Sequence, residues 1–176
     1  MKNYKFSLED IKKLEKNIVI LVDTREKKNE HITDYFTKYG IAYEKTKLNF
    51  GDYSFLIKSN DLVQHDIYFH DDIAIERKAT LEELSQNLAQ ERERFEKELL
   101  KAQANGCKMW LSVEDARGLG AIMEHGYKTE LKPLAYVASL KTFETRFNLH
   151  INFIDKRYSG FNIKSTFCYF LRDFLR

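Results

Sequence analysis

The sequence has little cysteine, little proline and no long apolar run, and each of these absences excludes a class of protein. Its 176 residues include two Cys and one Pro. Cys107 and Cys168 are too few for a disulfide scaffold and lack the spacing of a metal-binding pair, so we expect buried thiols in a cytosolic protein. Apolar runs such as 18–22 are far shorter than the ~20 residues of a membrane-spanning helix. The charged N-terminus has no apolar signal-peptide core, so we predict a cytoplasmic protein (nuclear in a eukaryote) that is not secreted.

A large excess of charge of one sign is also absent. The chain has 29 Lys and Arg against 27 Asp and Glu, a net charge of +2, and 43% of its residues are hydrophobic, which excludes a disordered chain. Residues 141–176 hold seven basic and three acidic side chains, so they carry +4 while residues 1–140 carry −2. A basic end of this size is compatible with a polyanionic partner. We assign the 10 Tyr, 13 Phe and one Trp mostly to the core, and none of them to base stacking.

Helical and strand patterns alternate along the chain, and no repeat or linker divides it. Helices are predicted over 7–16, 31–39, 132–148 and 162–176, with two more in succession between 80 and 105. Strands are predicted over 18–22, 42–48, 50–58, 66–70, 73–78, 107–113 and 150–154. This alternation predicts a single α/β domain over residues 1–176, with helices around a mixed sheet and the short helix at 7–16 as an appendage.

Charged side chains gather where three of the predicted strands begin or end. The segments are Val22-Asp23-Thr24-Arg25-Glu26, Phe50-Gly51-Asp52-Tyr53 and Ile75-Glu76-Arg77-Lys78. Because side chains alternate along a strand, Glu76 and Lys78 are expected on one face and Arg77 on the other. Mg²⁺ takes hard oxygen ligands, usually one or two carboxylates with water and a substrate phosphate, and Asp52 and Glu76 supply carboxylates. The pattern predicts metal-dependent phosphodiester hydrolysis.

Other charged groups near these segments have supporting roles in this interpretation. Lys78 would hold the nucleophile or the phosphate as a point charge. Asp23 and Glu26 are candidates for a second metal. Arg25 and Arg77 are expected to pair with neighbouring carboxylates, since a cluster of acids needs counter-charge when no metal is bound. Glu114, at the end of the predicted strand 107–113, is either a loop acid or a group behind the site.

The joint appearance of VDTRE, GDY and IERK in this order resembles the nuclease domain of the XPF/Hef family of structure-selective DNA endonucleases. The family signature is Gly-Asp, a variable spacer and Glu-Arg-Lys-x-x-x-Asp, after a strand that ends in Asp-x-Arg-Glu. In this chain Glu82 stands where the last Asp of the signature falls. The likeness covers roughly residues 18–114 and includes a helix that carries Arg92-x-Arg94.

The resemblance implies a restriction-endonuclease-like fold, a three-layer α/β/α sandwich around a mixed β-sheet, and DNA cleavage that depends on Mg²⁺ or Mn²⁺. The implied metal ligands are Asp23, Glu26, Asp52 and Glu76. The implied catalytic side chains are Asp52, Glu76, Lys78, Arg77 and Arg25. Lesser candidates are Glu82, Arg92 and Arg94, for which a helix-terminal charge or a solvated helix face is an alternative interpretation.

The predicted function is a DNA endonuclease that acts on branched or structured DNA in repair or recombination. Family members often carry a tandem helix-hairpin-helix module after the nuclease, and some carry a helicase before it; this sequence has neither, which leaves branched-DNA specificity and a homodimer or partner protein open. Two alternatives are a junction resolvase or restriction-type nuclease of the same fold, and a non-catalytic relative that binds DNA or a partner. The presence of Asp52, Glu76 and Lys78 disfavours the second.

Overall fold

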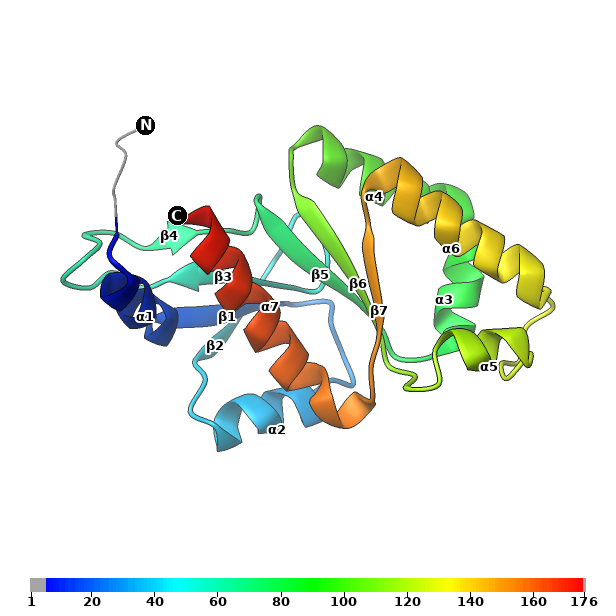
Figure 1. Cartoon of the computed structure of the whole chain (residues 1–176), viewed down its shortest axis with the longest axis horizontal. Coiled ribbons are helices and arrows are strands. Elements are labelled where there is room, and N and C mark those ends of the chain that lie inside the picture. Colours follow the sequence, from blue (N-terminus) through cyan, green and yellow to red (C-terminus); the bar gives the residue numbers. More distant parts are fainter. Residues whose placement is uncertain (1–5, 176) are drawn as a thin grey trace.

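Seven strands form one mixed sheet in the computed structural model, which describes residues 6–175 (Figure 1). They are β1 (Ile18–Asp23), β2 (Tyr43–Thr46), β3 (Tyr53–Ile57), β4 (Ile67–Tyr68), β5 (Ile73–Lys78), β6 (Lys108–Val113) and β7 (His150–Phe153). The order is β2-β1-β3-β5-β6-β7, with β4 paired to β3. Because β3 is antiparallel to β1 and β5, and the other neighbours on this path are parallel, five strands end at one edge of the sheet. We call it the carboxyl edge.

Helices cover both faces of the sheet, each over its own apolar core. They are α1 (Leu8–Lys16), α2 (Glu30–Lys38), α3 (Leu81–Leu88), α4 (Arg92–Ala104), α5 (Leu119–Met123), α6 (Pro133–Phe147) and α7 (Ser159–Phe174), with a 3₁₀ turn η1 (Lys156–Tyr158). One core joins β5 and β6 to α3, α4, α5 and α6. The other joins β1, β3 and β5 to α1, α2 and α7. In Figure 1 the first group of helices lies on the right and the second on the left.

Strand β5 belongs to both cores because its side chains alternate. Ile73 and Ile75 pack into the core beneath α1, α2 and α7, whereas Ala74 packs into the core beneath α3, α4 and α6. All six residues of β1 are buried, as the continuous apolar run of that strand predicts. The predicted three-layer α/β/α sandwich around a mixed sheet is confirmed.

Several boundaries differ from the sequence-based expectations. The strand expected over 66–70 is only the two-residue β4, because Phe69 turns inward and is 2% exposed. The last helix begins at Ser159, earlier than expected, after Asp155 accepts a hydrogen bond from the Arg157 amide and starts η1. The two helices expected between residues 80 and 105 are α3 and α4. Helix α5 follows the turn at Gly118.

The N-terminal caps of α1 and α3 differ from each other. Ser7 and Asp10 make a complete capping box at α1. At α3, the Thr80 hydroxyl accepts a hydrogen bond from the Glu83 amide at 3.2 Å, but the Glu83 carboxylate accepts one from the Ala79 amide at 2.9 Å instead of closing the box. The Glu83 side chain is thereby turned toward β5.

No helix within residues 6–175 is long and apolar enough to span a membrane.

Candidate active site

The three motif segments meet at the carboxyl edge. The Asp23 amide, at the end of β1, donates a hydrogen bond to the Asp52 carbonyl at 2.8 Å, and the Asp52 amide donates one to the Ile75 carbonyl at 2.8 Å. Gly51 makes this close approach possible, because its φ is +60° and a Cβ there would lie 2.9 Å from the Ile75 carbonyl oxygen. Backbone geometry therefore places Asp52 between the ends of β1 and β5.

Two neighbouring carboxylates act on Asp52. Burial, together with the negative charges of Glu76 and Glu26, raises the pKa of Asp52 well above its usual range. Burial also raises the pKa of Glu26, against the opposing effect of Arg77. The Oδ2 atom of Asp52 accepts a hydrogen bond from the Arg77 amide at 2.7 Å, which fixes the carboxylate at the end of β5. The structure thus brings Glu26, Asp52 and Glu76 into one acidic group.

Two buried cations of β5 neutralise this group from opposite faces of the strand. The Lys78 ammonium lies 2.6 Å from Glu76, and the side chain of Lys78 is 8% exposed. Burial lowers the pKa of Lys78, but Glu76 and Asp52 outweigh that effect and the net pKa is raised. The Arg77 guanidinium lies on the other face, 2.7 Å from Glu26, with its side chain 6% exposed. The alternation expected from the strand period is confirmed.

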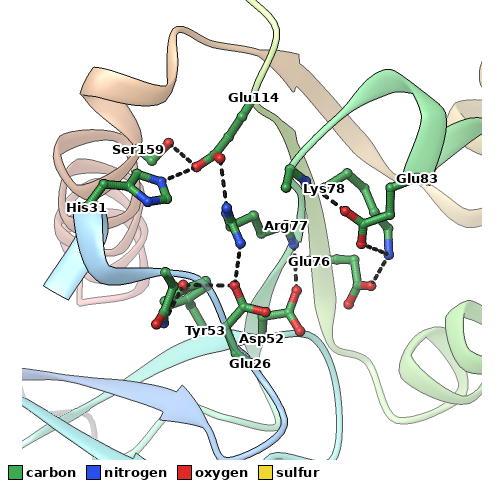
Figure 2. A network of polar contacts seen from close by, with 12 residues as sticks. Glu26, His31, Asp52, Tyr53, Glu76, Arg77, Lys78, Glu83, Glu114 and Ser159 are labelled. Carbon is green, nitrogen blue, oxygen red and sulfur yellow. Dashed lines mark hydrogen bonds and ion pairs between the residues drawn. The ribbon is translucent and has the colours of Figure 1, made fainter. Parts of the chain in front are cut away.

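Glu114 anchors the guanidinium of Arg77 from behind. Its carboxylate, 1% exposed, accepts a hydrogen bond from Arg77 at 2.8 Å and one from the Ser159 hydroxyl at 2.6 Å, and the His31 ring lies 2.7 Å away. Burial acts to raise the pKa of Glu114, but these three partners outweigh it and lower that pKa. Figure 2 shows how β5, β6, α2 and α7 converge on this carboxylate. It lies behind the acidic group and ties both helices to it.

Sequence reasoning missed most of this supporting layer. Glu114 had a signal, an acid directly after a buried strand, but His31 and Ser159 had none. Tyr53 was quoted only as part of a motif, yet its hydroxyl donates to Glu26 at 3.3 Å and accepts from the Asn29 amide group at 3.0 Å. These contacts join segments far apart in sequence, so no local sequence pattern predicts them.

Asp23 and Arg25 pair with each other beside the acidic group, where the Asp23 amide bonds to the Asp52 carbonyl. Both carboxylate oxygens of Asp23 accept hydrogen bonds from the Arg25 side chain, at 2.7 and 3.1 Å, and the Leu48 amide donates to Oδ2 at 2.7 Å. Burial acts to raise the pKa of Asp23, but these donors outweigh it and lower that pKa. Asp23 is 1% exposed. Its contacts therefore indicate that it secures the end of β1.

The three lesser candidates, Glu82, Arg92 and Arg94, contact residues outside the acidic group. Glu82 accepts a hydrogen bond from the Lys128 amide at 3.1 Å, in the loop after α5, while its neighbour Glu83 lies 3.8 Å from Lys78. Arg92 bonds to Glu96 at 2.9 Å and lies 5.0 Å over the Phe143 ring, between α4 and α6. Arg94 pairs with Glu91 at 2.5 Å on the exposed face of α4.

The oxygen atoms of the acidic group fit a hard divalent cation. Within residues 6–175, no three Asp, Glu, His or Cys side chains are already arranged as a metal-binding set. Even so, Asp52 Oδ1, Glu26 Oε2 and Glu76 Oε2 accept no hydrogen bond from any described residue, because the partners of each side chain use its other oxygen. Free carboxylate oxygens are the ligands that Mg²⁺ or Mn²⁺ prefers, so these three side chains have the chemistry of a site for such an ion.

The sheet topology and this acid–lysine centre define a restriction-endonuclease-like α/β domain. A family model described as the ERCC4 domain matches residues 22–165, which include all three motif segments. The chain belongs to the ERCC4 nuclease-domain family, which confirms the resemblance seen in the sequence.

Solved structures agree on the fold. XPF from Aeropyrum pernix matches with a TM-score of 0.59 and 17% identity, over 88% of this chain and 65% of that one. XPF from Aeropyrum pernix in complex with DNA matches with a TM-score of 0.62 and 16% identity, over 88% of this chain and 66% of that one. This chain thus spans just under two thirds of each. A comparison with curated proteins gives no match.

Proposed function

We propose that this chain is an Mg²⁺- or Mn²⁺-dependent DNA endonuclease that hydrolyses phosphodiester bonds in branched or structured DNA, in repair or recombination. The observation that carries the proposal is the acidic group of Glu26, Asp52 and Glu76 at the carboxyl edge, with Lys78 against Glu76. Membership of the ERCC4 nuclease-domain family supports the reaction class. Burial and mutual repulsion of the acids are features that concentrate at functional sites.

Each side chain of the centre has a role that follows from its contacts. Glu26, Asp52 and Glu76 would hold the ion through their free oxygens. A divalent ion bound there supplies an acidified water and offsets the charge that develops on the scissile phosphate. Lys78 is a compact cation within reach of the same phosphate or water. Arg77 would keep Glu26 oriented from the opposite face of β5, and its amide does the same for Asp52.

The internal ion pairs explain how such an acidic group folds without an ion. Lys78 and Arg77 each offset one carboxylate, so the free protein does not carry three uncompensated charges in a buried place. Lys78, held 2.6 Å from Glu76 in the free protein, would be available to the substrate phosphate when Glu76 serves as a ligand of the ion. In this scheme Lys78 exchanges one anionic partner for another during the reaction cycle.

The loops of the carboxyl edge supply basic groups for the DNA backbone. Residues of these loops include Arg25, Lys27, Lys28, Lys47, Arg117, Lys156 and Arg157. Arg25, Arg117 and Arg157 of these loops pair with Asp23, Asp115 and Asp155, just as Lys141, Arg146 and Arg172 elsewhere pair with Glu144, Glu96 and Glu15. The placement of the charges, more than their number, supports DNA binding at this edge.

A cleavage panel tests the proposal. Labelled flap, fork, four-way junction, single-stranded and plain duplex DNA are each incubated with Mg²⁺, with Mn²⁺ and with EDTA. Cleavage is expected only with a metal and fastest on a branched substrate. Asp52→Asn, Glu76→Gln and Lys78→Ala are each expected to lower the rate by ~10²-fold or more. Glu82→Gln is the matched control and is expected to cut at the wild-type rate, since its carboxylate contacts Lys128.

The panel also separates the alternatives. A rate for Glu76→Gln within about tenfold of wild type would overturn the assignment of the centre. Selective resolution of the four-way junction would identify a junction resolvase of the same fold. DNA binding without cleavage of any substrate, in either metal, would identify a non-catalytic relative.

A further inference from the structure

Two aromatic rings are exposed where α7 begins. Tyr158 and Phe161 are 57% and 56% exposed. Among residues 6–175, neither ring contacts another aromatic ring; the Arg157 guanidinium lies 5.7 Å from the Tyr158 ring. Tyr158 is the last residue of η1, and Phe161 lies in the first turn of α7, three residues later. Both aromatic rings are therefore free for a ligand.

The residue between these rings connects them to the reaction centre. Ser159 is 2% exposed, and its hydroxyl donates to Glu114 at 2.6 Å. Glu114 bonds to Arg77 at 2.8 Å, and Arg77 bonds to Glu26 at 2.7 Å (Figure 2). Three hydrogen bonds and the two groups between them span on the order of 10 Å. The first turn of α7, which begins at Ser159, is thereby tied to the acidic group.

The surroundings of the rings are basic. Helices α2 and α7 touch at Gly160, where a Cβ atom would lie 2.5 Å from the Tyr35 ring. His31, near the start of α2, and Ser159, at the start of α7, contact the same Glu114 carboxylate at 2.7 and 2.6 Å, so the loop 24–29 that precedes α2 lies near the segment 154–161. Together the two segments carry five basic and two acidic side chains. Lys156 is exposed and forms no ion pair with a carboxylate of residues 6–175, whereas Arg157 pairs with Asp155 at 2.7 Å.

We propose that Tyr158 and Phe161, with Lys156, bind an unpaired nucleotide of the DNA substrate beside the reaction centre. The base would stack on a ring, and the adjacent phosphate would contact the Lys156 ammonium. This inference rests on the proposed nuclease function and deepens it, because it names the feature of the substrate that the chain itself recognises.

The chemistry of this surface favours an unpaired nucleotide over plain duplex DNA or a protein partner. In a duplex the base faces are covered by stacking, so an exposed ring gains little from plain duplex DNA. Exposed rings also occur at protein interfaces, but charged side chains are depleted at the centre of such interfaces, and here basic groups flank the rings. A single-stranded arm presents both a base face and a phosphate, which match the two kinds of side chain.

The test compares DNA binding by the wild type with Tyr158→Leu/Phe161→Leu, which removes the rings and keeps apolar bulk. Tyr169→Leu is the matched control, because Tyr169 lies later on α7 and is 65% exposed. Fluorescence anisotropy in EDTA measures affinity for a splayed-arm DNA and for a plain duplex. The double variant is expected to lose roughly 5- to 150-fold for the splayed arm, the range of one base–aromatic stack, and less than twofold for the duplex. Circular dichroism confirms that each variant is folded.

A second readout locates the nucleotide. 2-Aminopurine placed at successive unpaired positions is expected to change fluorescence at one of these positions on binding the wild type and Tyr169→Leu, and at none of them on binding the double variant. Wild-type affinity of the double variant for the splayed arm, or an equal loss for the duplex, would overturn this proposal while leaving the nuclease intact. If light scattering shows that the double variant loses a dimer that the wild type forms, with both DNAs affected alike, the rings serve self-association. A wild type that neither binds nor cuts DNA would refute the proposed function itself.

Discussion

Replacing the Asp52 carboxylate should change how the stability of the metal-free protein depends on pH. Its pKa is raised well above the usual range, first by burial and then by Glu76 and Glu26. The change Asp52→Asn removes the charge and keeps an oxygen that accepts the hydrogen bond from the Arg77 amide, which is 2.7 Å long in the wild type. We therefore expect Asp52→Asn to gain stability relative to the wild type as the pH rises.

The sign follows from proton linkage. Above the unfolded-state pKa, ~3.9 for Asp, the folded protein holds a proton on Asp52 that the unfolded chain has released. This contribution to stability is complete below that pH and is lost as the pH rises through the folded-state pKa. One proton bound only in the folded state corresponds to a slope of up to ~1.4 kcal/mol per pH unit. For a domain of this size, 1.4 kcal/mol is a change of roughly 3–5 °C in Tm.

Urea unfolding in EDTA, followed by circular dichroism between pH 4.5 and pH 8, measures the effect. The free energy of unfolding of the wild type should decline with pH by more than that of Asp52→Asn. Asp66→Asn is the control, because Lys58 and the Ser59 amide lower the pKa of that exposed acid and its removal leaves the slope unchanged above pH 5. Parallel curves for the wild type and Asp52→Asn would refute the view that the three acids share one site in the free protein. A constant offset between the curves would not, because only a difference in slope reports the proton.

Three further perturbations test other parts of the centre. Mg²⁺ or Mn²⁺ at ten times its Kd should stabilise the wild type by ~1.4 kcal/mol, roughly 3–5 °C in Tm, and Asp52→Asn by less; a wild type that gains nothing would contradict a metal site in the free protein. Glu114→Ala should cost ~3–5 kcal/mol in urea unfolding, because it strips one carboxylate from the buried Arg77, against less than ~1 kcal/mol for Glu83→Ala, whose side chain is 45% exposed; the reverse order would show that Glu114 is not an anchor. Gly51→Ala should cost ~1–3 kcal/mol at its positive φ, and an equally stable variant would show that the loop adopts another conformation.

The sequence carried enough information to place the acidic group but not to assign every member of it. Strand periodicity correctly separated Arg77 from Glu76 and Lys78, because a period of two depends only on the local backbone. The motif order correctly placed Asp52 near Glu76, since an antiparallel connection returns the chain to the same edge. The assignment of Asp23 as a metal ligand stays a prediction. Its neighbour Arg25 occupies both of its oxygens, and the sequence alone does not show that contact.

The sequence also predicts the burial of the aromatic residues only in part. Their number suits a large core, and Tyr53 and Tyr136 are indeed fully buried. Tyr158 and Phe161 follow a similar local pattern, but they lie at the junction between η1 and α7, where both rings are exposed. Whether a ring at such a position is covered depends on how the helices pack against one another, and the local sequence does not show that packing.

The division of β5 between the two helical layers sets how the centre is controlled. Glu76 and Lys78 face the layer of α3, where Glu83 lies 3.8 Å from Lys78, while Arg77 faces the layer of α2 and α7 through Glu114. A slip of β5 by one residue would exchange these faces and remove the counter-charge from both ends of the acidic group. The register with β6, in which Lys78 pairs with Val113, is therefore a condition for the site as well as for the sheet. The Glu114 amide, which donates to the Lys78 carbonyl at 2.9 Å, fixes that register at the position where the chemistry needs it.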